Sequence, residues 1–214
     1  MASKAHIIVL PGGGYSHHAD HEGQPVVDWL NDVGVDASYF LYPISTPHPG
    51  PLEAVRAEVR RVRETGVEKV GLLGFSAGGH AAGLAALAPG DAASRVDAAI
   101  LCYPVVSMQL ETHADSRQQL IGLDASPELR EETSVDRAVT DAAPPFFVWH
   151  TVEDAAVPVE HAYLLGQALA AHHISHAMHV FAHGRHGLGL AIDEGPASAW
   201  TTLCAEWLHE LGWV

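Results

Sequence analysis

A serine flanked by glycines is the first candidate for chemistry in this sequence. The segment 74–78, Gly-Phe-Ser-Ala-Gly, follows an apolar run at 69–75 and precedes a stretch of small residues at 79–88. Glycines on both sides allow backbones to approach closely at a sharp strand-to-helix turn, which projects the Ser76 hydroxyl above the sheet. The dipole of the following helix favours negative charge developing there. This context predicts a nucleophile at Ser76; the alternative is a tight turn that contains serine by chance.

A second glycine-rich segment, residues 12–14, ends the first apolar run. Unobstructed N–H groups of Gly13 or Gly14 can supply one arm of an oxyanion hole, and the N–H of Ala77 can supply the other. Glycine-rich loops also bind phosphates, but here neither the dinucleotide-binding glycine pattern nor a P-loop lysine is present. The oxyanion interpretation is therefore preferred.

A serine nucleophile requires a general base, and the base requires a carboxylate that orients it. In the chain order serine, acid, histidine, both partners must follow Ser76. Asp154 comes after the apolar run 145–150 and before a helical segment, and His186 lies in a glycine-rich loop after the next run. We expect Asp154 to be the acid and His186 the base, with Glu153 as the alternative acid.

A parallel sheet is needed to position these residues. Short apolar or β-branched segments alternate with longer segments of helical period, which is typical of a parallel sheet covered by helices on both faces. The predicted strands are residues 6–10, 37–42, 69–75, 98–103, 145–150 and 176–181.

Amphipathic helices are predicted between these strands. Apolar residues recur at helical spacing after Pro51, within 26–30 up to Gly34, and within 159–171. The clearest pattern covers 200–211, and its apolar stripe should pack on the sheet.

The stretch from Ser107 to Asp141 interrupts the alternation, because it is polar and only weakly helical in pattern. Long connections in compact domains usually form lids or binding loops. We therefore expect a single domain over residues 1–214, with a short cap-like insertion at about 107–141.

Charge and composition disfavour several classes of protein. Asp and Glu number 26 against 11 Lys and Arg, so the formal net charge is −15, which repels nucleic acids and anionic membranes. The apolar run 7–10 is too short for a signal peptide or a membrane span. Cys102 and Cys204 lie in apolar segments, as expected of buried free thiols. We expect a cytoplasmic protein without nucleic-acid or membrane partners.

The sequence contains 16 histidines, a number that first suggests metal binding. Five of them recur every three or four residues between 173 and 186, but residues 176–181 are predicted as a strand, where this spacing separates the side chains. We therefore expect no metal site. His161 and His172 are expected to coat the solvated side of the helix at 159–171.

Tyr15, His17 and His18 lie just past the glycine loop, near the mouth of any site at Ser76. They are candidate contacts to a substrate. The alternative for the histidines is a purely structural role within the loop.

With these residues in place, the chain resembles the α/β-hydrolase superfamily. Within it, the chain is similar to the small esterases grouped with acetyl xylan esterases and feruloyl-esterase-like proteins, and more distantly to the hormone-sensitive-lipase type. The resemblance covers nearly the whole chain and implies that Ser76, Asp154 and His186 form a catalytic triad, with Ala77 and Gly13 or Gly14 at the oxyanion. Its motifs are Pro-Gly-Gly-Gly-Tyr at 11–15, His-Glu-Gly at 21–23, Gly-Phe-Ser-Ala-Gly-Gly-His at 74–80, Pro-Pro at 144–145, Val-Pro at 157–158 and His-Gly-Leu-Gly-Leu at 186–190.

The resemblance implies an α/β fold of the three-layer hydrolase type. Because the sequence opens at the third strand of the full hydrolase sheet, we expect a minimal, about six-stranded, mostly parallel sheet lacking the first two strands. Pro11 stands where lipase-type relatives have a histidine, which removes a donor that braces the loop. The short insertion disfavours a long-chain lipase.

The expected function is that of a serine carboxylesterase that cleaves short acyl esters, foremost acetyl groups on a carbohydrate, through an acyl-enzyme. An amidase or formamidase on the same triad is one alternative, since acyl transfer accepts oxygen or nitrogen leaving groups. A catalytically silent hydrolase fold that binds a small ligand is the other. No metal or organic cofactor is expected. A homodimer through an edge strand or the last helix is a further expectation, although Trp200 and Trp207 suit a core equally well.

Overall fold

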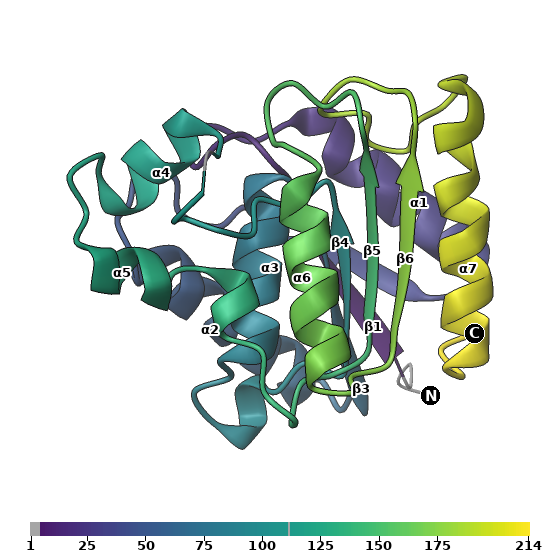
Figure 1. Ribbon diagram of the computed structural model, residues 1–214. Helices are drawn as coiled ribbons and strands as arrows, with labels where there is room; N and C mark the ends of the chain where they lie inside the picture. The colour runs from purple at the N-terminus through teal and green to yellow at the C-terminus, as the bar shows by residue number, and fades with distance from the viewer. Residues whose placement is uncertain (1–4, 111) are drawn as a thin grey trace.

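The computed structural model describes residues 5–110 and 112–214 (Figure 1). In this part of the chain, six strands form one sheet of order β2-β1-β3-β4-β5-β6, and each neighbouring pair is parallel. The strands are β1 (Ala5–Leu10), β2 (Asp36–Tyr39), β3 (Lys69–Phe75), β4 (Ala98–Cys102), β5 (Phe146–Thr151) and β6 (His176–Phe181).

Helices connect the strands in alternation. The α-helices are α1 (Gln24–Val33), α2 (Gly50–Glu64), α3 (Ala77–Leu87), α4 (Ala114–Ile121), α5 (Pro127–Glu132), α6 (Glu160–Ala171) and α7 (Trp200–Glu210). Short 3-10 helices are η1 (Asp20–Glu22), η2 (Ala92–Ser94), η3 (Val135–Arg137) and η4 (Gly195–Ala199).

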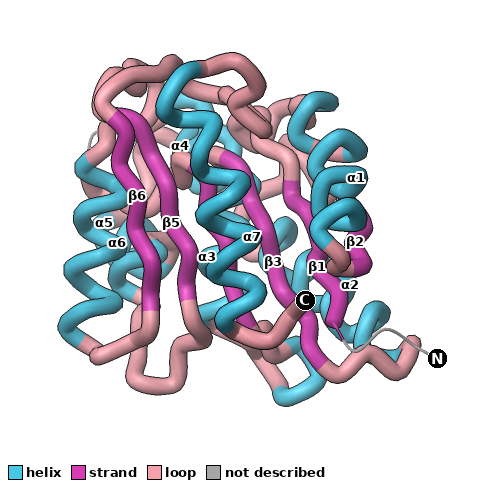
Figure 2. The backbone as a smooth tube through the Cα atoms, turned by 90° about the vertical axis from the view of Figure 1, so that its right-hand side faces the viewer, coloured by secondary structure: helices cyan, strands magenta, loops and turns pink. Residues whose placement is uncertain are grey.

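The sheet separates two apolar cores, because successive side chains of a strand point to opposite faces. In β1, Ile8 packs with α2, α3 and α6 on one face, whereas Ile7 and Val9 pack with α1 and α7 on the other. Figures 1 and 2 show these two helix layers from different sides. The fold is a minimal three-layer α/β sandwich, as the sequence predicted.

The strand predictions hold closely, with one instructive difference. The strands at 69–75 and 176–181 have the predicted bounds, but the strand predicted at 37–42 ends at Tyr39. Its neighbour β1 ends at Leu10 and is followed by Pro11, which has no N–H for a further ladder bond. The chain after Tyr39 therefore leaves the sheet.

The segment 107–141 contains α4, α5 and η3, which lie on the side of the sheet away from α7 (Figure 1). Val135 attaches this segment to the core, since its N–H donates to the Val106 carbonyl at 2.8 Å and a Cβ at Gly83 would lie 2.7 Å from its side chain. Gly83 thus gives η3 room to lie against α3.

The last helix packs as predicted, with Trp200 and Trp207 buried against the sheet. The prediction for His161 was wrong: this side chain is fully buried, and its Nδ1 accepts the N–H groups of Val106 and Ser107 at 2.9 and 3.2 Å. Its helix turns this position toward the backbone N–H groups at the start of the insertion rather than toward solvent. No helix in the described ranges combines the length and apolarity that a membrane crossing requires.

Candidate active site

Ser76 lies at the turn between β3 and α3, with φ 51° and ψ −116°. Its N–H donates to the Cys102 carbonyl, and its own carbonyl accepts the N–H of His80, each at 3.0 Å. A serine in the left-handed region is strained, and it persists only where surrounding bonds fix it. The turn therefore holds Ser76 above the carboxyl end of β3 in a fixed orientation.

Two glycines make this turn possible. A Cβ at Gly74 would overlap the Gly78 carbonyl oxygen, and a Cβ at Gly78 would overlap the carbonyl oxygen of Leu10 on β1. Both positions therefore require glycine, which is the physical reason for the Gly-x-Ser-x-Gly spacing.

The loops after β5 and β6 bring Asp154 and His186 to Ser76. The Ser76 Oγ lies 2.8 Å from His186 Nε2, and the His186 Nδ1 lies 2.6 Å from Asp154 Oδ2. Ser76 and Asp154 are each 6% exposed. A carboxylate at Nδ1 keeps the proton on that nitrogen, so the Nε2 lone pair faces the serine hydroxyl.

Asp154 is held as an ionised acceptor. Its Oδ1 accepts the N–H groups of Ala156 and Val157, each at 2.9 Å. Burial raises the pKa of Asp154, but the hydrogen bond and charge of His186, together with these two N–H groups, outweigh it, so the pKa lies below its usual value. His150 Nε2 lies 4.0 Å from the same Oδ2, and burial lowers the pKa of His150 to about 4, so this neighbour is neutral at pH 7.

The alternative acid, Glu153, points elsewhere. Its carboxylate is exposed and accepts from His183 Nδ1 at 2.8 Å and from the Gly184 N–H at 3.3 Å. Of the two adjacent carboxylates, Asp154 is the one that contacts His186.

Backbone donors for an oxyanion lie beside Ser76. Gly13 and Gly14 line the same cavity as Ser76, and Ala77 is the first residue of α3. Among the described residues, no hydrogen bond takes the N–H groups of Gly13, Gly14 or Ala77. These three donors are available for a ligand, as expected of a loop and a helix start.

The cavity at Ser76 is small, about 180 Å³, compared with the roughly 300 to 1,000 Å³ of drug-sized ligand sites. It is lined by Gly13, Gly14, His17, Ala19, His21, Glu22, Ser76, His113, His186 and Gly187. Its size suits a short acyl group.

His113 was not singled out in the sequence, yet it lines this cavity. It precedes α4 in the insertion, and its Nδ1 accepts the N–H of Ser116 at 3.3 Å, so the ring proton lies on Nε2. Burial lowers the pKa of His113, which favours this neutral form. The polar insertion thus contributes a residue to the lining of this cavity, but no motif in the sequence identifies which one.

Glu22 is the second residue that the sequence did not assign to the site. It is 2% exposed, and its carboxylate accepts the Gly12 N–H at 2.8 Å and the Tyr103 hydroxyl at 2.6 Å. The Tyr103 ring in turn lies edge-on to His186, with centroids 5.1 Å apart. Glu22 therefore braces the loop at Gly12 as a hydrogen-bond acceptor.

The three predicted substrate contacts differ in position. His17 lines the cavity at Ser76 and a neighbouring larger one, and His18 lines only the larger one. Tyr15 lies in the core instead, 1% exposed, with its hydroxyl 2.7 Å from His80 Nδ1. Its φ is 61°, and Tyr15 lines neither of these two cavities.

The sheet and the arrangement of serine, histidine and carboxylate at its carboxyl edge define an α/β-hydrolase. Within that class, the chain belongs to the prolyl oligopeptidase family, whose model matches residues 52–210. The predicted resemblance to the α/β-hydrolase superfamily is thus confirmed.

Similar proteins include esterases and enzymes of xylan breakdown. The chain is 36% identical to endo-1,4-beta-xylanase B of Butyrivibrio fibrisolvens over 88% of this chain and 33% of that protein, and 33% identical to acetylxylan esterase of Xylanibacter ruminicola over 72% and 34%. It thus spans about a third of the length of these two relatives. The crystal structure of an acetyl ester-xyloside bifunctional hydrolase from Caldicellulosiruptor lactoaceticus superposes with a TM-score of 0.94 at 38% identity, covering 99% of this chain and 85% of that one.

Proposed function

We propose that this protein hydrolyses short acyl esters, foremost acetyl esters of carbohydrates, with Ser76 as nucleophile, His186 as base and Asp154 as acid. The observation that carries the proposal is the continuous hydrogen-bonded line from Ser76 Oγ through the His186 ring to Asp154, at 2.8 and 2.6 Å. The small cavity above it supports a short acyl group.

In the first half-reaction, Ser76 Oγ attacks the ester carbonyl carbon while His186 Nε2 takes the hydroxyl proton. Negative charge moves to the carbonyl oxygen, toward the N–H of Ala77 and that of Gly13 or Gly14. Asp154 stabilises the imidazolium that forms. The C–O bond of the alcohol then breaks, and His186 returns the proton to the leaving oxygen, which leaves an acyl group on Ser76.

In the second half-reaction, water replaces the alcohol. His186 takes one proton from this water as the water attacks the acyl carbon. The proton then returns to Ser76 Oγ as the carboxylic acid leaves. The net reaction converts the ester and one water molecule into the carboxylic acid and the alcohol. This chain's residues supply every proton transfer in the cycle.

Acetyl and sugar specificity is supported by the relatives whose names refer to acetyl xylan and acetyl esters. The test is to incubate the protein with acetylated xylo-oligosaccharides and, separately, with an N-formyl aromatic amine. We expect release of acetate that disappears after treatment with a fluorophosphonate, with the added mass on the peptide containing Ser76. Faster cleavage of the N-formyl compound would favour the amidase alternative, and a protein that neither cleaves nor is labelled would favour a silent binding fold.

Two further expectations stay predictions. The cytoplasmic location rests on the thiols of Cys102 and Cys204, which are free and buried. A homodimer through an edge strand, β2 or β6, or through the last helix is the other expectation, and sedimentation tests whether a dimer forms.

A further inference from the structure

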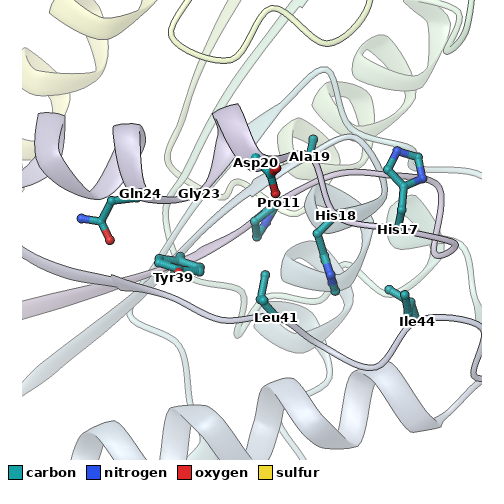
Figure 3. A pocket seen from close by; sticks show the side chains of 10 residues that line it. All are labelled: Pro11, His17, His18, Ala19, Asp20, Gly23, Gln24, Tyr39, Leu41 and Ile44. Atoms are coloured by element: carbon teal, nitrogen blue, oxygen red, sulfur yellow. The ribbon is translucent and has the colours of Figure 1, made fainter.

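A larger cavity of about 520 Å³ adjoins the one at Ser76. It lies between the segments 17–24 and 39–44, with Pro11 between them (Figure 3). The two cavities share His17 and Ala19. The two cavities therefore border each other at this segment.

One wall of this larger cavity is apolar and exposed. Tyr39 is 43% exposed, Leu41 54% and Ile44 37%, and all three come from the segment that leaves the sheet at the end of β2. Large apolar side chains gathered at a hollow of the surface are typical of ligand sites. Nothing in the core packing of β2 accounts for them, because they face the cavity.

The opposite wall carries groups that bind hydroxyls. His18 and Asp20 line it, and the carboxylate of Asp20 turns toward Pro11, whereas the ring of His17 points away from Leu41 and Ile44 (Figure 3). Gln24 donates its amide N–H to Asp28 at 2.7 Å, which fixes the amide and leaves its carbonyl oxygen as an acceptor. Hydrogen-bond donors and acceptors thus face an apolar surface across one cavity.

This combination matches a pyranose ring, which has apolar C–H faces and an edge of hydroxyl groups. An acyl chain fits less well, because it would remove water from Asp20 and His18 without replacing their hydrogen bonds. The Asp20 carboxylate and the net charge of −15 also repel anionic sugars.

We propose that the larger cavity binds the alcohol part of the substrate as a neutral pyranoside chain, with a ring stacked on Tyr39 and Leu41, while the acetyl group occupies the smaller cavity. This assignment rests on the proposed function, and it adds the site that selects the sugar. It makes Tyr39 and Leu41 specificity-determining residues.

The test compares two esters on each variant: acetylated xylotriose, which fills both cavities, and ethyl acetate, whose alcohol part is too small to fill the larger cavity. Tyr39→Ala and Leu41→Ser are paired with Tyr163→Ala and Leu123→Ser, whose side chains are equally exposed, 43% and 55%, but lie on α6 and between α4 and α5. We expect Tyr39→Ala and Leu41→Ser each to lower the ratio of the two kcat/KM values about five- to tenfold, since each removes one stacking surface. The control variants should keep the wild-type ratio.

A second measurement does not depend on ester cleavage. Xylotriose is titrated into Ser76→Ala and into Ser76→Ala with Tyr39→Ala, and binding is followed by ligand-observed NMR. We expect binding that weakens when Tyr39 is removed. If wild type cleaves both esters but the ratio is the same in all variants, the sugar site is wrong while the esterase proposal stands. If Leu41→Ser instead lowers cleavage of 4-nitrophenyl octanoate selectively, the cavity binds an acyl chain. If wild type cleaves neither ester but xylotriose binding still depends on Tyr39, the esterase proposal fails and the site remains.

Discussion

The Tyr103 hydroxyl donates to the Glu22 carboxylate at 2.6 Å, and this bond links two loops that the proposed reaction needs. The other Glu22 oxygen accepts the Gly12 N–H, next to the oxyanion donors. The Tyr103 oxygen also accepts the N–H of Gly189, in the loop that carries His186. Burial, and then the charge of Glu22, raises the pKa of Tyr103, so its hydroxyl keeps the proton that it donates.

Replacement of Glu22 by glutamine should therefore slow the reaction without weakening substrate binding. Glutamine has one acceptor oxygen where Glu22 uses two, so either the Gly12 or the Tyr103 bond is lost. We expect kcat to fall about ten- to hundredfold, the equivalent of one hydrogen bond to a charged group, with KM nearly unchanged. Tyr103→Phe keeps the ring against His186 and should give a similar loss. The double variant should lose much less than the product of the two; independent effects would show that Glu22 and Tyr103 do not act together.

Substitution of the adjacent carboxylates Asp154 and Glu153 should have very different effects on kcat. Asp154→Asn leaves the loop geometry in place but presents the wrong hydrogen-bonding group to His186, and we expect kcat for 4-nitrophenyl acetate to fall about ten-thousandfold. Glu153→Gln should change it by less than about threefold, because its ion pair with His183 is exposed. Equal losses in the two variants would contradict the assignment of the acid.

Gly13 tests the oxyanion loop. A Cβ at this position would overlap the His17 carbonyl oxygen, and φ is +125°, so Gly13→Ala must displace the loop. We expect kcat to fall by about a hundredfold or more, as on removal of one oxyanion donor. Gly66→Ala is the control, since φ is +93° there but a Cβ meets nothing within 4 Å. Gly66→Ala should lower the thermal midpoint without reducing kcat. A comparable loss of kcat in both variants would contradict a role of the Gly13 loop in stabilising the oxyanion.

Acid should destabilise the fold through His80. This side chain is fully buried, with Nε2–H donating to the Thr133 carbonyl at 2.7 Å, and burial lowers its pKa to about 4. The unfolded state therefore binds a proton that the folded state does not, and stability is lost as the pH falls from about 6.5 toward 4. At pH 5 the loss from this residue is about 2 kcal/mol.

Chemical unfolding at several pH values measures this effect. Glutamine in His80→Gln keeps a donor and an acceptor but does not titrate. The slope of the free energy of unfolding against pH should therefore be smaller over that range, by up to the contribution of about one bound proton. An unchanged slope would mean that His80 is not the responsible group. Burial lowers the pKa of His150 likewise to about 4, so this residue adds to the pH dependence with the same sign.

Local sequence patterns predicted the parts of the site that local geometry requires. Gly74 and Gly78 are needed within one turn around Ser76, and the strand and helix on either side are themselves periodic. Asp154 and His186 follow strands whose carboxyl ends meet at one sheet edge. Such features depend on neighbours in sequence or on the sheet order of an α/β fold, so they can be read before the structure is known.

The residues that sequence did not reveal depend on distant partners. Glu22 is defined by a hydroxyl 81 positions away, and no periodicity marks it as buried. His161 was predicted to lie on the solvated side of its helix, but it is buried because its Nδ1 accepts the backbone N–H groups of Val106 and Ser107, more than 50 positions away in the sequence. Tyr15 is turned into the core by a positive φ that its residue type does not suggest.

The most direct test is steady-state hydrolysis of 4-nitrophenyl acetate by wild type and by Ser76→Ala, with circular dichroism to establish that both are folded. We predict that wild type releases nitrophenolate and that Ser76→Ala is slower by about a thousandfold or more, because the alanine has no oxygen to attack the carbonyl and no proton to give to His186. A folded Ser76→Ala that keeps the wild-type rate would contradict nucleophilic catalysis at this serine.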